Sequence, residues 1–171
     1  HECSSAASDV YKRQTSNSYL VTNMSSGDYN DDGYVDLAVG SMYSSYFGGA
    51  SYGGAVVVFN GPLGNNLDVE SDYDYAFYDN SNNYLGHYAD TLNSGDIDGD
   101  GYDDMVIGEY SNDDAGYSSG VAMIQFGPLE GVNSFSNFGR AIYGSGTYNY
   151  VGRAGAIAVS YTHLRAHETT D

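Results

Sequence analysis

The chain carries one acidic stretch twice, reading GDYNDDGYVDLAVG over residues 27–40 and GDIDGDGYDDMVIG over residues 95–108. Oxygen-bearing side chains alternate in the first half of each stretch, and three apolar residues followed by a glycine close it. A short apolar run bounded by Gly and Asp predicts a strand rather than a helix. We therefore expect an acidic turn that leads directly into a β-strand, used two times.

The similarity continues beyond these two stretches. The segment GAVVVFNGPL at 54–63 corresponds to GVAMIQFGPL at 120–129, and YLG at 84–86 corresponds to YVG at 150–152. The spacing of 66 residues in both pairs is close to the 68 residues that separate the acidic stretches. Self-similarity at a nearly constant period over tens of residues indicates a repeat architecture.

Each period contains four short apolar runs bounded by Gly, Asn, Asp and Ser, which predicts four strands per period. The runs Val56–Phe59 and Met105–Ile107 are continuously apolar, so both faces of these strands should be covered. Four-stranded sheets that repeat in sequence and stack face to face are the blades of a β-propeller. The expected fold is all-β, a partial β-propeller with two four-stranded antiparallel blades and the start of a third. The expected strands lie at about 19–24, 35–40, 55–60 and 74–78, then at about 87–93, 103–109, 120–126 and 140–143, and near 155–159.

The acidic turns carry the donors that a calcium ion requires. Oxygen-bearing side chains occupy positions 1, 3, 5 and 9, and the glycine at position 6 permits a sharp reversal of the chain. Calcium takes roughly six to eight oxygen ligands, whereas magnesium prefers fewer protein ligands and a tighter octahedron. Without a cation these carboxylates would repel one another. For two Ca²⁺ sites, the expected side-chain ligands are Asp28, Asn30, Asp32, Asp36, Asp96, Asp98, Asp100 and Asp104, and the expected backbone carbonyl ligands are those of Tyr34 and Tyr102.

Other acidic residues of the repeat have a simpler interpretation. Asp31 and Asp103 fall between the ligand positions, and we expect them to be solvated loop carboxylates. Asp113 and Asp114 belong to an acidic face that keeps the protein soluble through its net charge. None of the four is assigned to a metal.

Position 12 of each turn separates the known calcium-binding classes. An EF-hand loop requires Glu there and then a helix, and a dockerin also requires an acid, but Val39 and Ile107 occupy this position inside strand-like runs. The pattern D-x-[DN]-x-D-G-x-x-D, leading into a strand and a glycine, resembles the FG-GAP repeat. This repeat is the blade unit of the integrin α-subunit β-propeller and of many secreted bacterial proteins. The resemblance implies that each turn joins the first two strands of a blade. It also implies that each turn holds one Ca²⁺ through its own four of the eight side chains named above.

The resemblance covers residues 15–158 and divides them into units. We expect one blade at 15–80, a second at 81–146 and the start of a third at 147–158. The two ends, 1–14 and 159–171, resemble translations of sequencing-adapter DNA and hold the single Cys and three of the four His. We expect both ends to be artefactual tails that take no part in the fold.

Composition excludes several classes of function. The chain has 23 acidic and 5 basic side chains, a net charge of −18, so we expect no nucleic-acid partner. No apolar run reaches the roughly 18 residues that a membrane span needs. Between residues 15 and 158 there is no Cys, no Lys and a single His (His87). We therefore expect no catalytic residues, and no enzyme activity in this part of the protein.

Together these features predict a calcium-binding β-propeller fragment of an extracellular binding or adhesion protein, secreted or on the cell surface, in which calcium is structural. Millimolar calcium outside cells suits turns that do not bind tightly. A protein or glycan ligand would contact the loops, and neighbouring blades would complete the propeller. Two alternatives stay open. One is an accessory or propeller part of a secreted hydrolase that cleaves glycans or phospholipids, and the other is a surface or matrix repeat with a purely structural role.

Overall fold

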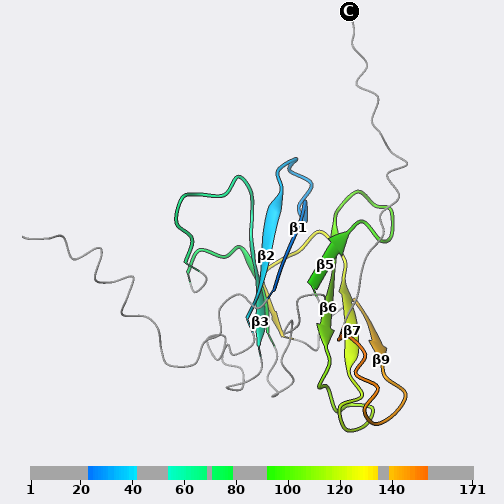
Figure 1. Cartoon of the computed structure of the whole chain (residues 1–171). Helices are drawn as coiled ribbons and strands as arrows, with labels where there is room; N and C mark the ends of the chain where they lie inside the picture. Colours follow the sequence, from blue (N-terminus) through cyan, green and yellow to red (C-terminus); the bar gives the residue numbers. More distant parts are fainter. Residues whose placement is uncertain (1–22, 42–53, 69–70, 79–91, 135–138, 154–171) are drawn as a thin grey trace, which may run out of the picture.

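The computed structural model describes residues 23–41, 54–68, 71–78, 92–134 and 139–153, and every regular element in them is a β-strand (Figure 1). These residues include no helix of the length and apolar character that a membrane crossing demands. The strands are β1 (Asn23–Gly27), β2 (Asp36–Ser41), β3 (Ala55–Phe59), β4 (Tyr75–Tyr78), β5 (Leu92–Gly95), β6 (Asp104–Glu109), β7 (Val121–Gln125), β8 (Val132–Ser134) and β9 (Arg140–Tyr143).

The strands form two sheets. In the first sheet, β1, β2, β3 and β4 are consecutive antiparallel neighbours, and β8 pairs in parallel with the outer side of β4. The second sheet has the order β5-β6-β7-β9, with every pair antiparallel. The first strands of the two sheets, β1 and β5, contact each other. The two sheets therefore lie side by side, as adjacent blades of a propeller do.

The expected fold class is confirmed. The structure is all-β, and each period supplies four antiparallel strands whose first two are joined by the acidic turn. The first strand of each sheet lies closer to its turn than the apolar runs indicated, since β1 begins at Asn23 and β5 at Leu92. Both strands are polar in sequence, NMSSG and LNSG, and their backbone pairing with β2 and β6 defines them instead. The strand expected near 155–159 and both terminal tails lie outside the described residues.

Strand β8 has no counterpart among the expected strands. Its sequence, Val-Asn-Ser, carries a single apolar residue, which is too little for a hydrophobic pattern to reveal. The chain reaches this strand directly after Leu129, whose side chain is buried and whose N–H donates to the carbonyl oxygen of Tyr29 at 3.3 Å. The segment from 129 to 134 therefore runs from the second period back onto the first sheet and connects the two blades.

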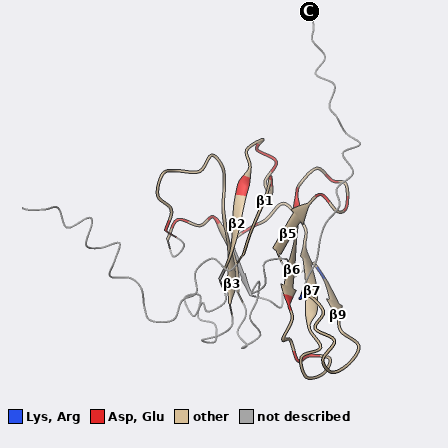
Figure 2. Cartoon of the chain, viewed as in Figure 1, with Lys and Arg blue, Asp and Glu red and all other residues tan. Residues whose placement is uncertain are grey.

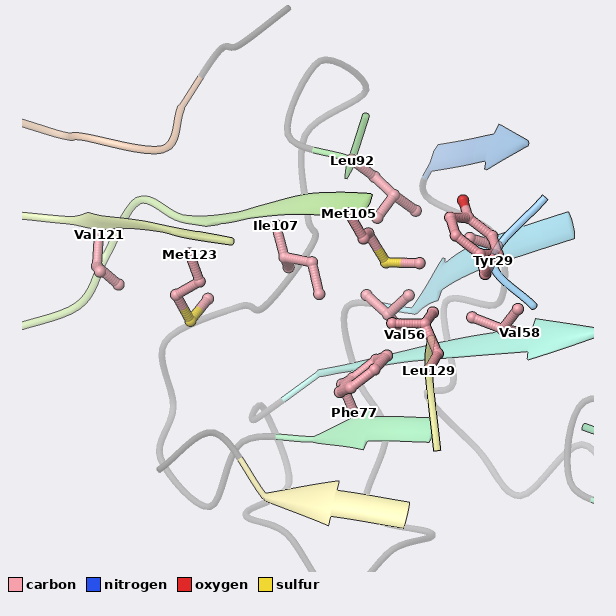
Figure 3. Close-up of a cluster of buried hydrophobic side chains, with 11 residues drawn as sticks. Tyr29, Val56, Val58, Phe77, Leu92, Met105, Ile107, Val121, Met123 and Leu129 are labelled. Carbon is pink, nitrogen blue, oxygen red and sulfur yellow. The ribbon is translucent and has the colours of Figure 1, made fainter. Parts of the chain in front are cut away.

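The main core lies between the two sheets. It gathers side chains from β2, β3 and β4 of the first sheet and from β5, β6 and β7 of the second, together with Leu129 and Tyr29 (Figure 3). Tyr29 is completely buried although it belongs to the first acidic turn. All five residues of β3 are buried, as the continuous apolar run predicts. A second, smaller cluster of Val39, Val57, Phe59 and Ala76 covers the other face of the first sheet. Burial on both faces is what a sheet stacked within a propeller requires.

Candidate metal centre

The two acidic turns lie at the same end of the two sheets, one between β1 and β2 and the other between β5 and β6 (Figure 2). Position 9 of each turn is the first residue of the following strand, Asp36 in β2 and Asp104 in β6. Both carboxylates are completely buried at the root of the turn. A buried, ionised carboxylate is stable only if its oxygens are hydrogen-bonded or neutralised, so the partners of these two residues define the site.

The two position-9 carboxylates have corresponding partners. Asp36 accepts hydrogen bonds from the N–H of Tyr29 at 2.9 Å and of Gly61 at 2.8 Å. In the second turn, the N–H groups of Ile97 at 2.6 Å and Gly127 at 2.9 Å donate to the Asp104 carboxylate. In each repeat the donors are position 2 of the same turn and the glycine of the Gly-Pro-Leu segment. These hydrogen bonds explain why the acidic turn and the Gly-Pro-Leu segment recur together.

The side chains at the other ligand positions fold inward onto the backbone of their own turn. In the second turn, the Asp96 carboxylate accepts hydrogen bonds from the N–H of Gly99 at 2.6 Å, of Asp100 at 3.1 Å and of Gly101 at 3.2 Å. The Asp100 carboxylate accepts from the N–H of Tyr102 at 3.0 Å. Gly101 has a φ of 102°, a conformation that residues with a side chain rarely adopt.

The first turn has most of the same internal hydrogen bonds. The Asp28 carboxylate accepts from the N–H groups of Asp32 at 3.1 Å and Gly33 at 3.0 Å, and Asp32 accepts from the N–H of Tyr34 at 2.8 Å. The side-chain oxygen of Asn30 accepts from the N–H of Asp32 at 3.1 Å. The side chains therefore bring their oxygens together within one short loop in both repeats.

Three carboxylates of the second turn meet most closely. Asp96, Asp98 and Asp104 each offer an oxygen atom, and these atoms lie within 4.8 Å of one another. Asp98 is exposed, Asp96 is half-buried and Asp104 is buried, so the cluster leads from solvent to the root of the turn. A set of ligands that consists of oxygen atoms alone fits a hard cation such as calcium. In the first turn, position 3 is Asn30, which contributes an oxygen without a charge.

The electrostatics of the turns also fit a cation. Burial raises the pKa of the Asp36 carboxyl, two backbone hydrogen bonds lower it, and the neighbouring carboxylates raise it further. Partial loss of hydration within the turn, with the charges of Asp100 and Asp104, raises the pKa of the Asp98 carboxyl, although this side chain is exposed. A raised pKa in an acid means that its ionised form is disfavoured where it stands. A bound cation would remove this penalty.

One residue of the second turn has a different place from the one expected. Asp103 is half-buried, and its carboxylate accepts a hydrogen bond from the N–H of Asp28 in the first turn at 2.8 Å. The expectation of a solvated loop carboxylate is therefore wrong for Asp103, because the neighbouring blade brings a backbone donor to it. Asp31, in contrast, is exposed as expected. No pattern within a single repeat signals the contact of Asp103, since it depends on how two repeats pack.

Asp113 and Asp114 are exposed, as expected, but they also organise the turn after β6. The Asp113 carboxylate accepts from the N–H of Ser118 at 2.6 Å, and the Asp114 carboxylate accepts from the side-chain amide of Asn112 at 3.3 Å. The connection between β6 and β7, which contains both residues, lies at the end of the sheet opposite the acidic turns (Figure 1). They take no part in the candidate metal centre.

Parts of the chain are similar in sequence to known proteins. Residues 21–59, which include the first acidic turn, match the family model of the FG-GAP repeat. The chain is also 33% identical over 87 residues to a protein named integrin alpha-5 from Xenopus laevis. This alignment covers 51% of the chain and 8% of the relative, so the chain spans less than a tenth of that protein's length. Neither match names an enzyme.

Proposed function

We propose, from the FG-GAP repeat that the chain contains, that it is a calcium-binding part of an extracellular, integrin-like β-propeller and that the calcium ions are structural. The observation that carries this proposal is the convergence of Asp96, Asp98 and Asp104 at the entry to β6. The likeness to the integrin chain supports a location outside the cell or on its surface and a role in binding a protein ligand. The chain itself does no chemistry in this proposal.

The ligands in this proposal are the ten residues expected from the sequence. In the first turn these are the side chains of Asp28, Asn30, Asp32 and Asp36 with the carbonyl of Tyr34, and in the second the side chains of Asp96, Asp98, Asp100 and Asp104 with the carbonyl of Tyr102. A bound Ca²⁺ supplies positive charge to a loop of converging carboxylates. The protein residues hold their oxygens inward, with the position-9 carboxylate fixed by two backbone N–H groups. The turns then keep the ends of β1 and β2, and of β5 and β6, in register.

Calorimetric titration of the full 171-residue chain with Ca²⁺ tests the proposal. We expect two sites, with Mg²⁺ binding at least tenfold more weakly because of its tighter octahedron. Asp98→Ala should abolish or weaken the site of the second turn by about tenfold, a loss of about 1.4 kcal/mol. Asp98 is exposed and accepts only a long backbone hydrogen bond, 3.3 Å from the N–H of Asp100, so the substitution removes a ligand without removing a structural contact.

Asp114→Ala is the matched control, because it removes one exposed carboxylate of the same blade at the opposite end of the sheet. We expect this variant to titrate like the unchanged chain. Calcium binding that survives Asp98→Ala at full affinity, or a chain that binds no calcium, would contradict the proposal. The role of the whole parent protein is tested separately, by screening a complete propeller against protein and glycan ligands.

A further inference from the structure

The two acidic turns are in direct contact through Asp28 and Asp103. The N–H of Asp28 donates to the Asp103 carboxylate at 2.8 Å, and the N–H of Asp103 donates to the carbonyl oxygen of Asp28 at 2.9 Å. Asp28 is position 1 of the first turn, and Asp103 directly precedes Asp104, position 9 of the second. Thus a pair of hydrogen bonds joins a proposed ligand of one site to the immediate neighbour of a proposed ligand of the other.

The space for this contact is provided by Gly27. A Cβ atom at this position would lie 2.8 Å from a carboxylate oxygen of Asp103 and 3.0 Å from its Cβ. Real Cβ atoms do not approach that closely, so any larger residue at position 27 would displace the Asp103 carboxylate. The glycine that opens the first turn therefore permits the second turn to reach it.

Tyr29 adds a second connection between the turns. Its side chain is completely buried in the core between the sheets, and its hydroxyl group makes a hydrogen bond to the hydroxyl of Ser94 in β5. Ser94 in turn is 2.7 Å from the hydroxyl of Ser25 in β1. The N–H of Tyr29 holds the Asp36 carboxylate, so position 2 of the first turn joins its own position-9 ligand to the second blade. Two consecutive residues of the first turn are thus anchored in the neighbouring blade.

We propose that Asp103 is a positioning residue that couples the two sites, so that occupancy of the second turn raises the calcium affinity of the first. This inference rests on the proposed function of the turns. A ligand that orders a segment lowers the cost of ordering whatever is attached to that segment. When the residues around Asp104 are ordered, Asp103 is ordered with them and holds Asp28 in place before the first site fills. Coupling between sites in proteins typically changes affinity by about fivefold or more.

The contact that carries this coupling comes from one side only, although the coupling free energy is the same for both sites. The residue of the first turn that corresponds to Asp103 is Val35, which is 65% exposed and has no carboxylate to offer. The chain therefore supplies a carboxylate from the second turn to the first, and none from the first turn to a blade before it. The second turn has Asp98 where the first has Asn30, so it should fill at lower Ca²⁺. Removal of Asp103 should then shift the midpoint of the first site much more than that of the second.

Glycine amides allow each site to be followed separately. Gly33 donates its N–H to Asp28 at 3.0 Å, and Gly101 donates to Asp96 at 3.2 Å, so each amide senses the position-1 carboxylate of its own turn. In ¹⁵N–¹H spectra of the full chain during a Ca²⁺ titration, these two resonances report the occupancy of the first and second turns. Hydrogen exchange of the Asp28 amide, measured in EDTA, reports the bond to Asp103 without any metal.

We expect Asp103→Ala to weaken calcium binding at the first site, as reported by the Gly33 amide, by about five- to tenfold. The Ca²⁺ midpoint of the second site, as reported by the Gly101 amide, should stay within twofold. Hydrogen exchange of the Asp28 amide should become faster. Asp103→Asn keeps a side-chain oxygen acceptor and should restore most of the affinity. Gly27→Ala should lower the calcium affinity of the first site as Asp103→Ala does, without changing the charge of the chain. It replaces Asp103→Ala in the experiment if that variant does not fold. Asp31→Asn removes one exposed charge from the first turn and should have less effect than Asp103→Ala.

A double-mutant cycle decides whether the sites are coupled. Asp98→Ala weakens calcium binding by the second turn. In the otherwise unchanged chain it should lower the calcium affinity of the first site, read from the Gly33 amide, about fivefold. In the Asp103→Ala background the same substitution should lower it by less than twofold. An unchanged midpoint at Gly33 after Asp98→Ala, or the same loss in both backgrounds, would overturn the coupling while leaving calcium binding intact. If neither glycine responds to Ca²⁺, the proposed function fails, and the coupling fails with it.

Discussion

Asp36 and Asp104 occupy the same place in the two repeats, and each has a structural role that does not depend on a metal. Both side chains are buried and accept two backbone N–H groups, one from their own turn and one from the Gly-Pro-Leu segment. Asp98, in contrast, is exposed and accepts a single long hydrogen bond. Residues proposed as ligands in the same turn therefore differ in what they contribute to folding.

Asp104→Asn should destabilise the chain even in EDTA. The substitution puts an NH₂ group where an oxygen now accepts from Gly127 or Ile97, which leaves two buried donors facing each other. The expected loss is about 1–3 kcal/mol of unfolding free energy, measured by urea denaturation in EDTA. Asp98→Asn is the control and should change the unfolding free energy by less than about 0.5 kcal/mol. Equal stability of the two variants would show that the Asp104 hydrogen bonds are dispensable.

Tyr29 should make the stability of the chain sensitive to alkaline pH. Burial raises the pKa of its phenol well above the ordinary value of 10.0. Below pH 10 the phenol is neutral in both the folded and the unfolded chain, so it does not change the free energy of unfolding with pH. Above pH 10 the unfolded chain releases the phenol proton while the folded chain retains it. Stability should therefore fall as the pH rises past 10. Urea midpoints between pH 8 and 11 should fall less steeply in Tyr29→Phe, and parallel curves for the two chains would contradict this expectation.

At the scale of elements, β7 and the segment from 144 to 152 approach each other so closely that only glycine fits between them. Gly120 and Val151 form an isolated parallel bridge, and the N–H of Gly144 donates to the carbonyl of Gly120 at 3.0 Å. A Cβ atom on Gly120 would lie 2.2 Å from the carbonyl oxygen of Val151, and the φ of Gly120 is 74°. The segment after β9 is therefore held against the start of β7 by backbone contact.

Three glycine substitutions separate the cost of this contact from the cost of an unusual φ. Gly64→Ala meets no atom within 4 Å and should change the unfolding free energy by less than about 0.5 kcal/mol. Gly131→Ala has open space but a φ of 67°, so we expect a loss of about 1 kcal/mol. Gly120→Ala combines both costs and should lose more than about 2 kcal/mol. Similar urea midpoints for Gly131→Ala and Gly120→Ala would mean that the backbone around Val151 moves away from a Cβ atom at position 120 at little cost in free energy.

At the scale of the whole molecule, the second sheet ends in an exposed strand. All four residues of β9 are exposed, with Ile142 58% and Tyr143 48% accessible, and the outer edge of β9 pairs with no strand among the described residues. An exposed edge strand with apolar side chains is a site for association with another chain. The net charge of −18 opposes such association by repulsion between molecules.

Ile142→Lys should reduce self-association of the chain at high salt. Salt screens the repulsion between acidic molecules, so the apolar edge of β9 then governs the contact, and a lysine on this edge disfavours pairing. Light scattering after size exclusion in about 1 M NaCl should give a lower average mass for this variant. Leu63→Lys, at a residue 44% exposed before β4, is the control and should associate like the unchanged chain. Equal masses for all three chains would exclude β9 as the edge of association.

The sequence by itself determined the repeat, the strand character of most elements and the composition of the two turns, because each of these depends on residues close together in the chain. The continuous apolar run of β3 predicted a strand buried on both faces, and glycine at position 6 predicted the reversed chain at Gly33 and Gly101. The polar strand β1 was located only in part, since Met24 and its neighbours carry no hydrophobic pattern and are identified by their pairing with β2.

Only the tertiary structure decided how the two repeats meet. The hydrogen bond from Tyr29 to Ser94, the addition of β8 to the first sheet and the bond from Asp28 to Asp103 all join residues far apart in the chain. The nearest pairs in sequence, such as Ala76 and Val132, are 132 − 76 = 56 residues apart. A pattern within one repeat carries no information about a contact made by its neighbour. Hydrogen bonds and burial between blades are fixed by packing, so Asp103, which looks solvated in the sequence, joins the two acidic turns in the folded chain.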